Sequence, residues 1–98
     1  MIIYCKNLKV ESIKNRNLIK RLMITKIENI DINELKIFEN LRELSIYECE
    51  IKNFSEIKNF KSLELLKLDG SKIDNEKVLW EIQDIINIQY NKTYHVGF

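Results

Sequence analysis

The residues best suited to chemistry in this chain are two cysteines and a single histidine. Cys5 and Cys49 are candidate nucleophiles, and His95 is a candidate general base. A thiol becomes an effective nucleophile when a base lies within hydrogen-bonding distance of it. Metal-binding pairs such as CxxC and HxxxH, and the motifs GxxxxGK and GxSxG, do not occur in the sequence. The sequence therefore predicts a protein that is not an enzyme and that has no cofactor and no metal site.

The length and composition indicate one domain, residues 1–98, inside the cell. A chain of 98 residues suffices for a single hydrophobic core of modest size. No apolar run approaches the roughly 18 residues needed to span a membrane, and the N-terminus lacks the pattern of an export signal. Two cysteines in such a chain are expected to be reduced thiols. We therefore expect a cytoplasmic protein that has no membrane partner.

Charge is distributed unevenly along a chain that is nearly neutral overall. The net charge of +1 gives no general reason to expect binding to nucleic acid. Residues 1–26 contain seven basic residues and one acidic residue, whereas residues 27–98 contain nine basic and fourteen acidic residues. The first segment therefore carries +6 and the remainder −5. This asymmetry leaves open the binding of RNA or a nucleoprotein through the basic N-terminal end.

Apolar residues recur with a period of 22 along the chain. A fixed period of about 20 to 50 residues is the signature of a repeat fold. Three of the repeating positions are Ile19, Leu41, Leu63 and Ile85; then Leu22, Leu44, Leu66 and Ile88; then Ile2, Ile24, Ile46, Leu68 and Tyr90. The register is the same for all three positions. The sequence therefore predicts successive equivalent units in which residues 22 apart lie side by side.

The units LRELSIYECEI and LELLKLDGSKI, and more weakly IKRLMITKIENI, follow the pattern L-x-x-L-x-L-x-x-N-x-I. The chain therefore resembles the leucine-rich repeat family, in its 22-residue internalin-like class, over nearly its whole length. The resemblance implies an α/β solenoid with about five parallel strands on the concave face and short helices or 3₁₀ turns on the convex face. The strands are expected to centre on residues 2–4, 22–24, 44–46, 66–68 and 88–90.

Alternation within each strand separates inward from outward residues. Leu44 and Ile46 flank a polar residue, so both are expected to face the core, with Ser45 facing outward. The outward set comprises Arg21, Met23, Thr25, Lys26, Glu43, Ser45, Tyr47, Glu48, Leu65, Lys67, Asp69, Asn87, Gln89 and Asn91. The candidate partner-binding residues among them are Arg21, Met23, Glu43, Tyr47, Leu65, Lys67 and Asp69. Tyr and Arg are enriched at binding hot spots, although isolated apolar residues are also common on surfaces.

The segments between the strands carry the pattern of helical turns. NELKIFENL and SEIKNFKSL place apolar residues three apart, as expected for a turn that packs against a core. The N-caps of these turns are expected at Asn33 and Ser55. A longer amphipathic helix is expected in DNEKVLWEIQDII, capped by Asp74 or Asn75. Trp80 is expected to help close that end of the molecule.

One position departs from the family pattern. Where the family usually has an Asn that hydrogen-bonds the turn backbone, this chain has Cys5, Ile27, Cys49, Ser71 and Thr93. Cys and Ser are small enough to substitute, but the turn at Ile27 is expected to be irregular or to use Asn29. On this alignment Cys5 lies about 10 Å from Cys49, too far for a disulfide. The separation between Cys49 and His95 is also too large for a hydrogen bond, so buried, unreactive thiols are expected.

Three functional hypotheses remain. The first is a non-enzymatic protein-protein interaction module, such as a small stoichiometric inhibitor of the phage anti-defence (anti-CRISPR) type, or a cellular adaptor. This suggestion rests on size and on analogy with other small binders. The second is nucleic-acid binding through the basic N-terminal end. The third is a homodimer formed through edge strands near Ile2–Tyr4 or Ile88–Tyr90.

Overall fold

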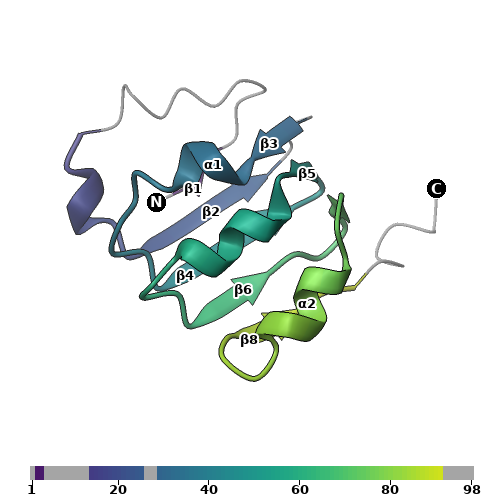
Figure 1. The fold of residues 1–98 in the computed structure, drawn as a ribbon. Coiled ribbons are helices and arrows are strands. Elements are labelled where there is room, and N and C mark those ends of the chain that lie inside the picture. The colour runs from purple at the N-terminus through teal and green to yellow at the C-terminus, as the bar shows by residue number, and fades with distance from the viewer. Residues whose placement is uncertain (1, 4–13, 26–28, 92–98) are drawn as a thin grey trace.

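Short strands and short helical turns alternate along the chain in the computed structural model (Figure 1). The structure describes residues 2–3, 14–25 and 29–91. In chain order the elements are β1 (Ile2–Ile3), 3₁₀ helix η2 (Arg16–Leu18), β2 (Arg21–Thr25), β3 (Asn29–Asp31), α1 (Ile32–Leu35), β4 (Glu43–Tyr47), β5 (Glu50–Lys52), 3₁₀ helix η3 (Phe54–Asn59), β6 (Leu65–Lys67), β7 (Lys72–Ile73), α2 (Lys77–Ile82) and β8 (Asn87–Gln89). None of the helices in these ranges is long and apolar enough to cross a membrane.

The strands form two parallel sheets, so the fold class is α/β. The larger sheet has the order β1-β2-β4-β6-β8, and the smaller sheet has the order β3-β5-β7. Every strand pair in both sheets is parallel. The helical turns cover one face of the larger sheet (Figure 1). Each strand of this sheet overlaps a segment where the repeat predicts a strand, which confirms the parallel α/β prediction.

The register of the larger sheet places equivalent repeat positions side by side. Leu22 pairs with Leu44, Leu44 pairs with Leu66, and Leu66 pairs with Ile88. Each of these pairs is offset by 22 residues, the period of the apolar pattern. Because side chains alternate between the two faces of a strand, this pairing aligns the inward residues of neighbouring strands.

The prediction of one uninterrupted register is wrong at two places. Ile24 pairs with Ile3 instead of Ile2, an offset of 21 residues. In the smaller sheet Ile30 pairs with Ile51, again with an offset of 21. The connection between β2 and β3, residues 26–28, is one residue longer than residues 48–49 between β4 and β5. The return to the 22-residue register occurs at Asn53, an additional residue with φ of 55° before η3.

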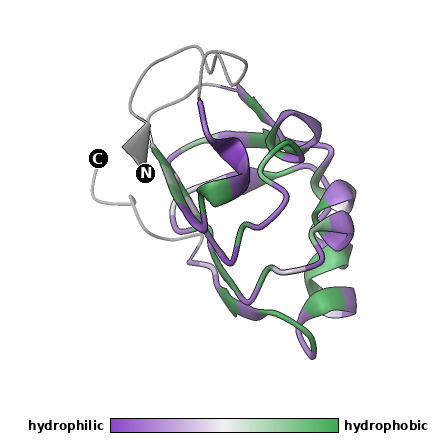
Figure 2. Ribbon diagram, turned by 90° about the vertical axis from the view of Figure 1, so that its left-hand side faces the viewer, coloured by the Kyte–Doolittle hydropathy of each residue, from purple (hydrophilic) through white to green (hydrophobic). Residues whose placement is uncertain are grey.

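The core lies between the larger sheet and the helical turns. Leu22, Ile24, Leu44 and Ile46 are buried, whereas the residues between them in β2 and β4 remain partly exposed. All buried apolar side chains among the described residues belong to one cluster. Viewed from the side, the helical turns carry both hydrophobic and hydrophilic residues (Figure 2), as expected for turns with one face against the core. Phe38 fills the centre of this cluster and is fully buried.

The backbone N–H groups at the beginnings of α1 and η3 donate hydrogen bonds to acidic side chains that are not at the predicted cap positions. Asp31 is the N-cap of α1, and its carboxylate accepts from the Asn33 N–H at 2.9 Å and from the Asn53 amide at 3.0 Å. The Asn53 amide and the Asn33 N–H hold the pKa of Asp31 below its usual 3.8. Asp74 does not cap α2; its carboxylate accepts from the N–H groups of Asn53 and Phe54 at 2.8 and 3.1 Å. The predicted caps Asn33 and Ser55 are therefore wrong, because the capping carboxylates come from an earlier position or from the next unit.

Ser71 and Cys49 occupy the position where the leucine-rich repeat pattern has Asn. The Ser71 hydroxyl donates to the Ile46 carbonyl at 2.8 Å and accepts from the Cys49 N–H at 3.2 Å. The Cys49 thiol is buried and donates to the Tyr47 carbonyl at 3.1 Å. These bonds pair backbone groups of the turn with small side chains. Ile27 and Thr93, at the same repeat position, lie outside the described residues.

The last unit differs from the repeat. Ile85, predicted in the column of Leu41 and Leu63, is 78% exposed, and Ile86 is buried instead. This shift follows from α2, where the Ile85 and Ile86 N–H groups both donate to the Ile82 carbonyl. The extra helical turn places Ile86 against the core and directs Ile85 outward. Trp80 is 73% exposed, so the prediction that it closes this end is wrong.

Leu65 and Leu66 are neighbours in β6 whose side chains lie on opposite faces of the sheet. Replacing each of them by alanine tests which one faces the core. Leu66 is fully buried, whereas Leu65 is partly exposed. We expect Leu66→Ala to lower the free energy of unfolding by about 2–5 kcal/mol, because it leaves a cavity in the core. Leu65→Ala is expected to cost less than about 1 kcal/mol. Urea unfolding of both variants measures the difference, and equal losses would show that the assignment of faces is wrong.

Candidate partner-binding surface

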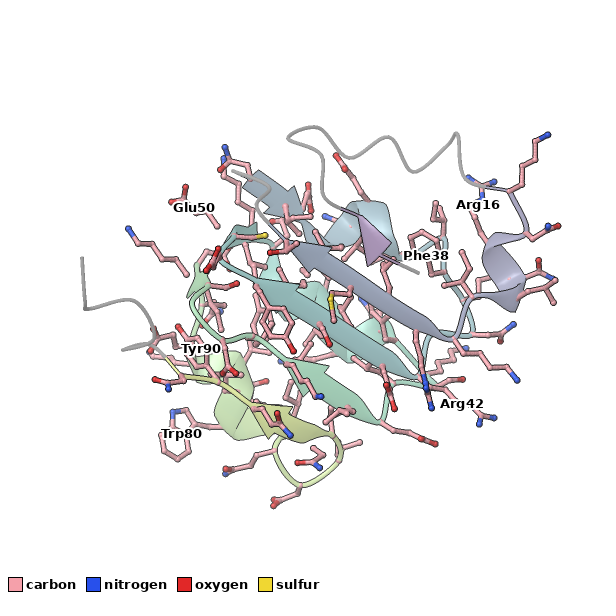
Figure 3. The ribbon with its side chains drawn as sticks, turned by 180° about the vertical axis from the view of Figure 1, so that it is seen from behind. Arg16, Phe38, Arg42, Glu50, Trp80 and Tyr90 are labelled. Carbon is pink, nitrogen blue, oxygen red and sulfur yellow. The ribbon has the colours of Figure 1, made fainter. Side chains whose placement is uncertain are left out.

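The uncovered side of the larger sheet carries most of the predicted partner-binding residues. We call the outward residues of β2, β4, β6 and β8 the front face. The pairing arranges them in rows across the sheet: Arg21, Glu43, Leu65 and Asn87; Met23, Ser45, Lys67 and Gln89; then Thr25 and Tyr47. Neighbouring strands lie about 4.8 Å apart, so five strands span roughly 20 Å. Figure 3 is seen from behind Figure 1 and looks onto this side of the sheet.

The structure brings six of the seven partner-binding candidates together in adjacent rows. Arg21 and Glu43 form an ion pair at 3.4 Å between Nε and Oε2. Both side chains are substantially exposed, so this pair orients the two groups and adds little stability. Asp69, the seventh candidate, lies in the turn after β6, and its carbonyl accepts from the Glu48 N–H at 3.3 Å. Lys26, from the wider outward set, lies outside the described residues.

Three apolar side chains stand among the polar groups of the front face. Met23, Tyr47 and Leu65 are all half-buried on it. They lie on three neighbouring strands, β2, β4 and β6, whose backbones are fixed by parallel pairing. A rigid strand holds these side chains in place before any contact forms, which lowers the entropy lost on binding. The three apolar side chains lie in three different rows, with Ser45 and Lys67 in the row between those of Tyr47 and Leu65.

The residues considered for catalysis do not form a site in the described part of the chain. The Cys49 sulfur is buried and hydrogen-bonded to the Tyr47 carbonyl. Cys5 and His95 lie outside the described residues. Within the described ranges no group of three or more His, Cys, Asp or Glu side chains is placed to hold a metal ion.

A strained residue lies at the end of β4, beside the front face. Glu48 has φ of 55°, in the left-handed region, although it is not glycine. Gly70, the residue 22 positions further on, has φ of 76° in the equivalent turn. The left-handed conformation costs a residue with a Cβ atom about 1–2 kcal/mol, whereas glycine adopts it freely. The left-handed conformation is therefore a feature of the turn in both units, and at Glu48 it lowers the stability of the fold.

An open groove at the last unit was missed by sequence reasoning. It has a volume of about 590 Å³ and lies between α2 and β8, with Leu79, Trp80, Ile88 and Tyr90 among its lining residues. The Tyr90 hydroxyl donates to the Ser71 carbonyl at 3.2 Å, which fixes one wall. The signal in the sequence was Trp80, a large aromatic residue on an expected amphipathic helix that also offers Val78, Leu79 and Ile82 for its inward face.

Comparison with known proteins identifies no relative of this chain. No protein-family model, curated protein or solved structure gives a significant match.

The equivalent turns at Glu48 and Gly70 share a left-handed backbone but carry different residues. Substitutions at both positions test the strain at Glu48. Glu48→Gly is expected to raise the free energy of unfolding by about 0.5 kcal/mol, because the relief of strain exceeds the entropy cost of glycine. Gly70→Ala is expected to lower it by at least about 1 kcal/mol. Glu50→Gly, two residues further in β5, provides the control and is expected to destabilise. Thermal unfolding of the three variants measures these changes; a destabilising Glu48→Gly would contradict the account.

Proposed function

We propose that this chain is a small solenoid of the leucine-rich repeat type that binds a protein partner through its front face. The observation that carries the proposal is the row-by-row placement of Met23, Tyr47 and Leu65 on a sheet face that the helical turns leave uncovered. The 22-residue pairing of equivalent leucines supports the repeat assignment. Solenoids commonly use such continuous sheet faces for binding.

The chemistry of the front face suits a protein surface of mixed character. Its apolar residues supply area that a partner removes from water, at roughly 25 cal/mol per Å². Arg21 and Glu43 are of opposite sign, with side chains 78% and 39% exposed, and Asn87 at the end of the same row is exposed. Polar groups of this kind select a partner and its orientation more than they strengthen the complex. We propose a complementary patch on the partner in which apolar groups alternate with polar ones.

The size of the molecule suits a function in which it acts by covering part of a partner's surface. A sheet about 20 Å wide supports an interface of standard size once neighbouring turns contribute. A protein that only occupies a surface acts in proportion to its amount, as a stoichiometric inhibitor or an adaptor does. Inhibitors of the phage anti-defence type are one such class, proposed here by analogy of size and not from a motif.

A triple substitution on the front face tests this proposal. We expect Arg21→Ala, Tyr47→Ala and Leu65→Ala together to abolish capture of the partner, because they remove two of the three apolar side chains and one charge of the front face. The measurement is affinity capture from a lysate of the native host, with mass spectrometry of the retained proteins. The wild type is expected to retain a protein that the triple variant loses.

The matched control places three alanines on the helical side, at the exposed residues Glu34, Ser55 and Lys77. This variant is expected to retain the same protein as the wild type. Circular dichroism of both variants checks that the fold persists. Equal retention by the front-face variant and the wild type would reject the front face as the binding site.

A further inference from the structure

The two ends of the stacked units present different surfaces. β1 and β8 are the edge strands of the larger sheet. On the helical side, η2 belongs to the first unit and α2 to the last (Figure 1). Figure 3 shows Arg16 of η2 and Trp80 of α2 at opposite extremes of the molecule. Each end therefore combines a strand edge with an exposed helical turn.

The C-terminal end exposes large apolar side chains. Trp80 is 73% exposed and Ile85 is 78% exposed, on α2 and in the turn that follows it. Trp80 lines the groove beside β8, and Ile85 lines a second, smaller groove on the other side of α2. Ile85 shares its groove with Phe60 and Leu63 of the preceding unit, whereas Trp80 lies on the side of α2 beside the edge strand β8. The exposed Trp80 is therefore the large apolar group that a neighbour at this end can contact.

Among the described strands, none pairs with the outer edge of β8. The Asn87 N–H donates to the Glu64 carbonyl at 2.9 Å, and the Gln89 carbonyl accepts from the Leu68 N–H at 2.8 Å. Backbone groups alternate in direction along a strand, so those of Ile88 point away from β6. β8 contains no charged residue and no proline, the usual protections of an edge strand.

The N-terminal end carries an exposed apolar residue among basic ones. Leu18 in η2 is 70% exposed. Residues 14–25 contain four basic residues, Lys14, Arg16, Lys20 and Arg21, and no acidic residue. Residues 73–91, at the opposite end, contain four acidic residues, Asp74, Glu76, Glu81 and Asp84, and one basic residue, Lys77. These described residues sum to +4 at the first end and −3 at the last, where Glu81 is paired with Lys58 and Asp74 accepts from the Asn53 and Phe54 N–H groups. The described parts of the two ends therefore differ in the sign of their charge, and each exposes an apolar side chain.

We infer that a second copy of this chain docks head-to-tail, with its N-terminal end against the C-terminal end of the first. In this contact β1 of one copy extends the sheet at β8 of the other. All five strands of the sheet are parallel, so stacking by simple repetition keeps the strand direction. Leu18 meets the exposed Trp80, and the basic residues in and beside η2, Lys14, Arg16 and Lys20, meet the acidic end. Such a heterologous contact leaves one free end on each side and produces open chains of copies.

Two end-blocking variants and their mixture test the head-to-tail contact. The first replaces the exposed Trp80 by Lys, and the second replaces Arg16 and Leu18 by Glu. Light scattering coupled to size exclusion measures the mass over a series of protein concentrations. For the wild type in about 50 mM NaCl we expect a mass that rises with concentration beyond that of a dimer, and that falls in about 500 mM NaCl.

Each end-blocked variant is expected to stay monomeric alone, because it retains only one intact end. An equimolar mixture of the two is expected to form dimers, since each supplies the end that the other lacks. The control variant, Glu34→Lys with Lys52→Glu, changes exposed charges in the middle units and is expected to assemble as the wild type does. Circular dichroism checks that every variant is folded.

Three results would overturn the inference. A wild type that stays monomeric at all concentrations shows that the ends do not bind each other. A dimer that persists in the Arg16→Glu, Leu18→Glu variant shows that two β8 edges pair symmetrically. Binding of RNA with a steep dependence on salt, in a protein that does not self-associate, assigns the basic end to nucleic acid instead.

Discussion

The parallel pairing of equivalent leucines is the constraint on which the rest of the structure depends. Leu22, Leu44 and Leu66 occupy one row across three strands, and all three are buried. A shift of one residue in this pairing would turn the apolar set toward solvent and the polar set toward the core. The burial of this row therefore fixes both which side chains form the core and which side chains form the front face.

Much of this arrangement was predictable because it depends on period and alternation. The repeat predicted the places of the strands in the larger sheet and the outward direction of Ser45 and Tyr47. The 21-residue offset between β3 and β5 was not predictable, since one added residue before β3 is compensated by one more at Asn53 before η3. The burial of Ile86 in place of Ile85 depends on how far α2 continues. Ile85 and Ile86 are apolar neighbours that fit the repeat equally well, so the packing of the folded chain decides which of them is buried.

The two proposed surfaces use different parts of the same framework. The front face depends on residues that alternate with the core row, so the positions of its side chains are fixed by the strand pairs that carry them. The ends depend on what the last and first units leave uncovered, which includes Trp80 and Leu18. Binding at the front face and stacking at the ends do not compete for residues other than Arg21. One molecule therefore has room for both roles.

Methyl contacts in solution test the central row most directly. In a nuclear Overhauser spectrum of protein with labelled leucine methyl groups, the account predicts cross-peaks between Leu22 and Leu44 and between Leu44 and Leu66. Direct cross-peaks between Leu22 and Leu66 are expected to be weak or missing, because two strand spacings of about 4.8 Å separate them. A spectrum without the Leu22–Leu44 and Leu44–Leu66 contacts would contradict the register, and with it the front face.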